Sequence, residues 1–270
     1  MPKKKKKEVE ARPVKSLKGI ELQYQRELMK LGRALALAVR TELLPLLKAE
    51  QPAYVSDGLA NNLNAVFLSL NKQFSGVATF SFARQAASQA ITKTERANKT
   101  RFDKSVKAAT GVDLGSILSA EGLEEFTELN VSKNVSLIKS LPEEYLKSVE
   151  TIVTNGVSSG ARFSTIEKQI TAKIGSANSK LVNRIKTIAR NEVQTINSQI
   201  SLRRSEKLGI KRGIYRTSED ERVRKCHAEL NGVEYDLAKG AWSKSCQKFI
   251  QPGITDINCR CSYSPIIEVD

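Results

Sequence analysis

The 270-residue sequence has few aromatic side chains and no long apolar run. Aromatic residues make up only 6% of the chain, which disfavours a platform that stacks the bases of single-stranded nucleic acid. A membrane-spanning helix needs about 18 or more consecutive apolar residues, and the sequence contains no such run. The charged start "MPKKKKKEVEARPVKS" is followed by no apolar stretch, so it lacks the pattern of a signal peptide. We therefore expect the protein to work in the compartment where it is made.

Cysteine and histidine are equally scarce, with four cysteines and one histidine. In the compartment where the protein is made, glutathione keeps thiols reduced, which favours other uses of these cysteines over a structural disulfide. All five residues lie in the last 45 positions of the chain. Any chemistry that they carry is therefore expected in the C-terminal part.

Positive charge is abundant. Apolar residues make up 40% of the chain, enough for a packed core, and the formal net charge is +15. Residues 1–13 hold six basic and two acidic side chains, and residues 180–225 hold thirteen and five. Concentrated positive charge attracts polyanions, so we expect contact with the backbone of nucleic acid without sequence readout. The candidate contacts are Lys3, Lys4, Lys5, Lys6, Lys7, Arg203, Arg204, Lys207, Lys211 and Arg212.

Helical periodicity dominates the first two thirds of the chain. After a basic flexible tail over 1–13, apolar residues at steps of three and four predict a helix from about Val14 that ends near Pro45. A second helix is expected after Asp57, interrupted near Gly76, to about Ala109. Together they predict a long helical hairpin within a helical region over 14–133. Ser140, with Pro142 in the first turn, predicts a further helix that ends at Gly156.

A capping box at "STIEKQI" and a third periodic stretch from Ser176 to Leu208 complete the predicted helices. Beyond Gly209 the period shortens, and "IKRGIYRTS", "GVEYDL" and "RCSYSPII" predict strands around a short helix at Glu221–Leu230. The predicted fold class is therefore mainly α, with a small C-terminal α+β module that contains a short antiparallel sheet.

Three interpretations fit the cysteines and the histidine. In the first, His227, Cys259 and Cys261 hold a structural zinc ion with Asp256 or Cys246 as the fourth ligand, because two cysteines one residue apart on a strand face the same side. In the second, "HAE" at 227–229 belongs to a zinc deaminase, but that signature needs P-C-x-x-C, which is not present. In the third, the residues are buried packing groups without a metal.

Several blocks along the chain carry a family resemblance. "TIARNE" (187–192), "GIKRGIYRTSEDERVRKCHAELNGVEYDL" (209–237) and "PG…NCRCSYSPII" (252–267), with "NVSLIKSLPEEYLKSVETIVTNGVSSG" (134–160) upstream, resemble the phage Mu protein F-like family. The family consists of minor head proteins, or head morphogenesis proteins, of tailed double-stranded DNA phages. The resemblance implies a family domain over 134–270, with helices over 141–208 and the α+β module over 210–270.

The resemblance also implies a ligand set. Family members commonly carry a cysteine pair that falls on Arg224 and His227 here, and a histidine that falls on Asp256. The implied ligands of a structural zinc ion are His227, Asp256, Cys259 and Cys261, with Cys226 and Cys246 as alternatives.

The function implied by the resemblance is structural. We expect a virion component of the capsid interior, present in the host cytoplasm during assembly, with no enzymatic activity and no small-molecule substrate. Its expected partners are the portal protein, the major capsid protein and packaged DNA. Two rival functions stay open: a basic DNA-binding protein of nucleus or nucleoid, for which "PKKKKK" would be an address signal, and a metal-dependent nuclease.

Overall fold

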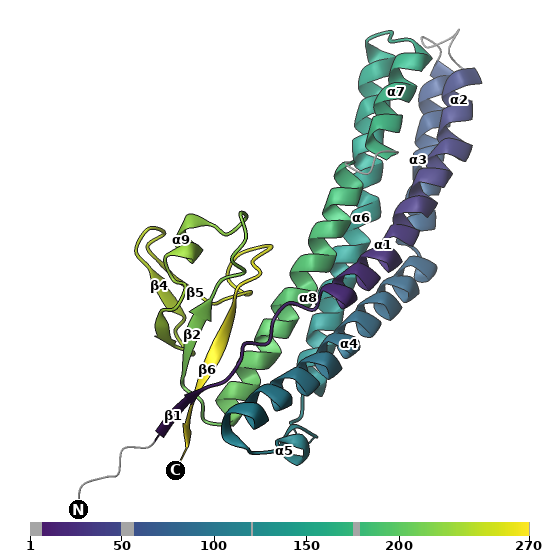
Figure 1. Ribbon diagram of the computed structural model, residues 1–270. Coiled ribbons are helices and arrows are strands. Elements are labelled where there is room, and N and C mark those ends of the chain that lie inside the picture. The colour runs from purple at the N-terminus through teal and green to yellow at the C-terminus, as the bar shows by residue number, and fades with distance from the viewer. Residues whose placement is uncertain (1–6, 50–56, 120, 175–178, 270) are drawn as a thin grey trace, which may run out of the picture. The chain divides into compact units, whose positions relative to one another are not determined.

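The computed structural model describes residues 7–49, 57–119, 121–174 and 179–269. In these residues the chain is mainly helical, with two small antiparallel sheets (Figure 1), which confirms the predicted fold class. It divides into two compact units, each built from stretches far apart in the sequence. The helical unit comprises Leu22–Gln89 and Val131–Ala189, and the sheet-bearing unit comprises Met1–Glu21, Ala90–Asn130 and Arg190–Asp270.

The first predicted helix starts later and ends later than expected. Helix α1 spans Lys18–Ala38, a π-helical turn η1 spans Val39–Leu43, and α2 continues over Leu44–Ala49. The expected end near Pro45 is wrong because this proline falls in the first turn of α2, where its missing N–H is tolerated. Within the helical unit, η1 contacts α3.

The second predicted helix is confirmed together with its interruption. Helix α3 spans Asp57–Ser75 and α4 spans Val77–Thr110, with the break at Gly76. A short helix α5 follows at Gly115–Ser119. In the described part of the chain, no helix combines the length and the apolar character that crossing a bilayer requires.

The predicted boundaries around Ser140 and Gly156 are wrong. Helix α6 runs without a break over Glu124–Ser158, Pro142 lies inside it, and the Ser140 hydroxyl donates to the carbonyl of Leu137. Gly156 serves a different purpose: a Cβ there would lie 2.6 Å from Cγ1 of Ile166 on α7 (Phe163–Ile174). The glycine therefore permits close packing of α7 on α6.

The sheet-bearing unit carries a four-stranded antiparallel sheet of order β1-β6-β2-β3. Its strands are β1 (Lys7–Glu10), β2 (Arg212–Arg216), β3 (Glu234–Asp236) and β6 (Ser262–Val269). In the register, Val9 pairs with Ile267 and Tyr215 with Tyr263. The expected flexible tail is therefore wrong for Lys7–Glu10, which forms an edge strand, while residues 1–6 lie outside the described residues.

A second sheet pairs β4 (Ala241–Ser243) with β5 (Lys248–Ile250), a hairpin that the sequence patterns did not predict. Helix α8 spans Lys180–Lys207, close to its expected limits, and the short helix α9 spans Lys225–Ala228. The core of the module gathers buried side chains from these elements: Ile210, Tyr215, Cys226, Leu230, Tyr235, Leu237, Ala241, Ile250, Cys259, Cys261 and Tyr263. The candidate site lies in this core.

Candidate metal centre in the C-terminal module

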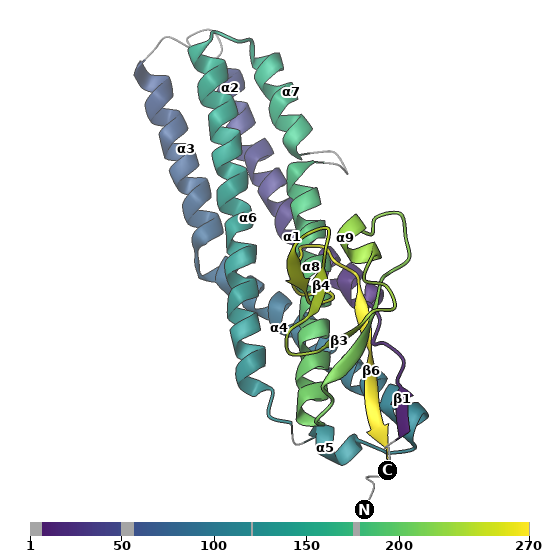
Figure 2. The same cartoon turned by 90° about the vertical axis from the view of Figure 1, so that its left-hand side faces the viewer.

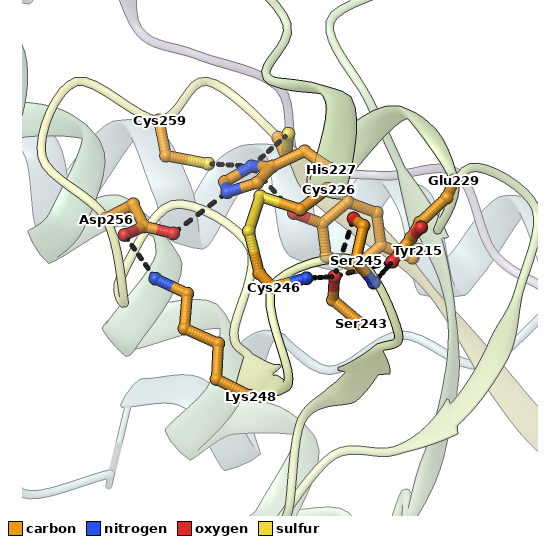
Figure 3. The surroundings of a disulfide bond; sticks show 11 residues. Tyr215, Cys226, His227, Glu229, Ser243, Ser245, Cys246, Lys248, Asp256 and Cys259 are labelled. Atoms are coloured by element: carbon orange, nitrogen blue, oxygen red, sulfur yellow. Dashed lines mark hydrogen bonds and ion pairs between the residues drawn. A yellow bond between two sulfur atoms is a disulfide. The ribbon is translucent and has the colours of Figure 1, made fainter.

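His227 and two cysteines converge in the core of the module. His227 lies on α9, and Cys259 lies on the loop that leads into β6 (Figure 3). Cys261 is the last residue of the same loop. Nδ1 of His227 is 3.4 Å from Sγ of Cys259 and 3.5 Å from Sγ of Cys261. The side chains are almost fully buried, with exposed fractions of 1%, 4% and 2%. The cysteine pair was predicted on a strand, but β6 begins at Ser262, directly after Cys261. Both thiols nevertheless face Nδ1 of His227.

Asp256 holds the opposite edge of the imidazole ring. Its Oδ2 lies 2.9 Å from Nε2 of His227, and its Oδ1 accepts a hydrogen bond of 2.7 Å from Nζ of Lys248 (Figure 3). Burial acts to raise the pKa of Asp256, but the hydrogen bonds from Lys248 and His227 outweigh it and lower the pKa. Asp256 is therefore an anion that orients the ring.

Helix α8 fixes the backbone of the thiol loop. Nε2 of Gln194 donates to the carbonyl of Cys261 at 3.3 Å, and Oδ1 of Asn191 accepts from the N–H of Asn258 at 2.9 Å. Gly253, at φ +75°, donates its N–H to Sγ of Cys259 at 3.3 Å. A Cβ at Gly253 would overlap the hydroxyl of Ser198, so only glycine fits.

The pKa values of the two thiols are shifted in opposite directions. A hydrogen bond from the Cys261 thiol lowers the pKa of Cys259 to about 4, against the effect of burial and with further help from His227. The same hydrogen bond and burial raise the pKa of Cys261. The contact with Cys259 also raises the pKa of His227 despite its burial. The cluster thus favours a thiolate at Cys259 beside His227, and both side chains are buried.

The other two cysteines form a disulfide, which corrects the expectation that a disulfide was the less favoured use. Cys226 and Cys246 are bonded, with their Cα atoms 5.7 Å apart (Figure 3). The bond links α9 to the turn between β4 and β5. Neither residue is therefore available as an alternative metal ligand while this bond is present. The pairing could not be read from the sequence, where the two cysteines are 20 residues apart. The β4–β5 hairpin is what brings Cys246 close to Cys226.

The donor set fits three positions of a tetrahedral zinc site. Nδ1 of His227 and the Sγ atoms of Cys259 and Cys261 all lie within 4.8 Å of one another. Thiolate and imidazole are the ligands that zinc prefers, and a ligating histidine usually bonds a carboxylate through its other nitrogen. Asp256 occupies that second role, because it faces Nε2 and not the thiols. Its predicted role as a direct ligand is corrected accordingly.

The arrangement also resembles a catalytic triad, with Cys259 in the place of the nucleophile, His227 in that of the base and Asp256 in that of the carboxylate that orients the base. Cys259, His227 and Asp256 follow one another through hydrogen bonds as in Cys–His–Asp catalytic sites. A nucleophile must reach a substrate atom, however, and the Cys259 side chain is only 4% exposed. Burial therefore favours a structural use. Sequence reasoning also missed Tyr215, whose hydroxyl lies 3.2 Å from Nδ1 of His227.

The predicted DNA contacts are only partly available. Arg204 is 1% exposed and forms a buried ion pair with Glu121, a second ion pair of 2.9 Å with Glu95, and a hydrogen bond to Asn98. Its predicted DNA contact is wrong, because these partners hold the guanidinium inside the unit. The spacing of Ile196, Ile200 and Arg204, four residues apart, was the signal that places this arginine on the inward face.

The other candidates differ in their surroundings. Arg212 forms ion pairs with Glu8 and with Glu234, and Nζ of Lys207 donates to the carbonyl of Glu121. Arg203 is exposed, with its guanidinium 4.5 Å from the centroid of the Phe126 ring. Lys211 is exposed and Lys7 belongs to β1, whereas Lys3, Lys4, Lys5 and Lys6 lie outside the described residues. Among the described residues, the sequence-predicted cations therefore differ in how accessible they are to DNA.

Comparisons with known proteins agree with the sequence motifs. Residues 147–264 match the family described as Phage Mu protein F like protein. An uncharacterized protein of Haemophilus influenzae is 27% identical over 262 residues, which cover 95% of this chain and 55% of that protein. The chain thus spans about half the length of this curated relative. No solved structure matches the chain. The family match over residues 147–264 agrees with the resemblance that the sequence motifs carry.

Proposed function

We propose that the protein is a minor head protein that acts in head morphogenesis of a tailed double-stranded DNA phage. The observation that carries the proposal is the family match over residues 147–264, which includes the whole cysteine–histidine cluster. The most reactive groups of that region are buried, which supports a role in building a particle over a role in turning over a substrate.

The expected partners are the portal protein, the major capsid protein and the packaged DNA. The net charge of +15 supports a place inside the filled head, where DNA is dense and an acidic protein would be repelled. Phosphate contacts without base readout suffice for such a partner. In this proposal the protein is present in the host cytoplasm during assembly and then in the capsid interior.

The cysteine–histidine cluster stabilises the module in this proposal. Zinc bound there would cross-link α9 to the loop before β6. His227, Cys259 and Cys261 are the residues that would hold it, and Asp256 would orient His227. A small module gains stability from such a cross-link, because the free energy of metal binding contributes to folding.

Mass spectrometry of salt-washed, DNA-filled particles tests the proposal. Particles made with the wild-type gene are expected to contain this chain, together with the portal protein as an internal reference. A Cys259→Ser/Cys261→Ser variant is expected to be incorporated less, because its module is weakened. Lys168→Gln, at an exposed position of the helical unit, serves as the matched control. Absence of the wild-type chain from infectious particles would overturn the proposal.

A further inference from the structure

The segment that joins β1 to α1 buries every third residue. Ala11, Val14 and Leu17 are 1%, 9% and 2% exposed, although the segment is neither helix nor strand (Figure 1). Each of these residues is followed by an exposed cation: Arg12, Lys15 and Lys18. With about 3.1 to 3.4 Å per residue in an extended chain, successive cations stand about 10 Å apart. The segment thus presents a row of positive charge.

Neighbouring elements hold the row in place. Nη1 of Arg101 donates to the carbonyls of Lys15 and Ser16, at 3.3 and 3.4 Å. The hydroxyl of Ser105 donates to the carbonyl of Arg12 at 2.5 Å. These bonds, all within the sheet-bearing unit, fix the backbone without using the side chains of the row. A ligand would therefore meet a preorganised surface and lose little affinity to ordering it.

The row forms one wall of a cleft of about 750 Å³. Thr217, Ser218 and Ser262 also line the cleft with their hydroxyl-bearing side chains, and no aromatic residue lines it among the described residues. Hydroxyls donate hydrogen bonds to phosphate oxygens, whereas base stacking needs aromatic rings. The lining is therefore suited to a phosphate backbone and not to exposed bases.

Acidic residues at the cleft are largely neutralised by other cations. Asp220 pairs with Arg260 at 2.5 Å, and Glu10, next to the segment, pairs with Arg216 at 2.5 Å. Across the described residues, the side chains of the row form no ion pair. Glu219 is the remaining acid in the lining, against three uncompensated cations. The cleft therefore keeps a positive surplus that an anionic ligand can neutralise.

We propose that Arg12, Lys15 and Lys18, with the cleft beside them, bind the phosphate backbone of double-stranded DNA. The proposal rests on the proposed function and names a surface for its DNA contact. Arg204 was predicted to contact DNA but is buried, so the proposal assigns the contact to other residues. The excess of basic residues over 180–225 did not point to this row. The extended spacing of the cations suits a polyanion that offers many phosphates in succession.

Fluorescence anisotropy of a labelled mixed-sequence duplex tests the proposal with the full-length protein. Binding constants are measured from about 50 to about 300 mM salt. The variant Arg12→Gln/Lys15→Gln/Lys18→Gln is expected to bind more weakly, with a log–log salt slope smaller by about 3, because each phosphate contact contributes about 1. The variant Arg12→Lys/Lys15→Arg/Lys18→Arg keeps the charges and is expected to keep the slope.

The matched control removes the same charge elsewhere. Lys72, Lys147 and Lys168 are exposed in the helical unit, and Lys72→Gln/Lys147→Gln/Lys168→Gln is expected to keep the wild-type slope. If both triple glutamine variants lost the same DNA affinity and the same salt slope, the proposed surface would be wrong. The DNA contact of the proposed function would still stand. If the wild-type protein bound no duplex at the lowest salt, both the proposed surface and the DNA contact of the proposed function would be overturned. Equal thermal midpoints of all variants exclude misfolding as the cause.

Discussion

Asp256 and His227 share a hydrogen bond of 2.9 Å on the edge of the imidazole that faces away from the two thiols. This bond turns Nδ1 toward Cys259 and Cys261, so the ring is oriented for a metal before any metal is bound. The arrangement is the one expected of a carboxylate behind a ligating histidine.

Removal of this carboxylate is expected to weaken zinc binding without unfolding the module. Asp256→Asn should lower the zinc affinity by about 10- to 100-fold, since the ring loses its orienting anion. Competition with a chromophoric chelator measures the affinity. Glu125→Gln, at an exposed position with the same change in charge, should leave it unchanged. Wild-type protein that folds normally and takes up no zinc would leave the thiols as packing groups.

The disulfide between Cys226 and Cys246 is expected to stabilise the module by closing a loop. With a sequence separation of 20 residues, the loss of chain entropy in the unfolded state corresponds to about 3 kcal/mol. Cys226→Ser/Cys246→Ser should lose about this amount in urea denaturation followed by the fluorescence of Trp242, the single tryptophan. Under reducing conditions, the difference from wild type should disappear. Thiol titration of oxidised, denatured wild type should find two free thiols, and four would disprove the bond.

Arg204 and Arg203 are adjacent on α8 but should differ greatly in their contribution to stability. Arg204→Met leaves Glu121 as a buried carboxylate without its partner, so a loss of about 3 to 5 kcal/mol in the free energy of unfolding is expected. Arg203→Met removes only an exposed contact with Phe126 and should cost about 1 kcal/mol or less. Chemical denaturation compares the two.

A double variant separates charge burial from packing at the same place. Arg204→Met/Glu121→Met replaces the ion pair by apolar groups and should recover most of the stability lost in Arg204→Met, because no charge stays buried without a partner. If the two single arginine variants were equally stable, the assignment of Arg204 to the interior would be contradicted.

Glu229 gives the β4–β5 hairpin a dependence on pH. Hydrogen bonds from the Ser243 hydroxyl and the Ser245 N–H lower the pKa of this carboxyl below its usual 4.5. Because the folded pKa is depressed, the stabilisation is present above the pKa of the unfolded chain and is lost as the pH falls through the folded pKa. The stability difference between wild type and Glu229→Gln should therefore be constant from pH 7 to about pH 5 and shrink below about pH 4. A difference that grows in acid would contradict these hydrogen bonds.

Local patterns predicted the helices well because a helical stripe depends only on residues three and four apart. The break at Gly76 and the limits of α8 follow from such patterns. The boundary at Ser140 failed because packing along α6 outweighs the local preferences of one serine and one proline. Strand β1 was missed because its partner β6 lies more than 250 positions away in the sequence.

In the candidate site, the residue types were predictable and the roles were not. The scarcity of cysteine and histidine singled out His227, Cys259 and Cys261, and the family motifs supported the same three. The role of Asp256 depended on which ring nitrogen it faces, and the disulfide depended on a hairpin that the sequence did not reveal. Distance and direction decide these roles, and both arise from pairings that span the module.

By itself, the sequence determined the helical class of the protein, its positive charge and the concentration of thiols near the C-terminus, since composition and short-range periodicity carry this information. Only the tertiary structure decided which cations face inward, which thiols pair with each other and which nitrogen of His227 meets sulfur. Long-range contacts fix the burial and direction of each side chain, and these determine whether a charge stabilises the core or can meet a polyanion.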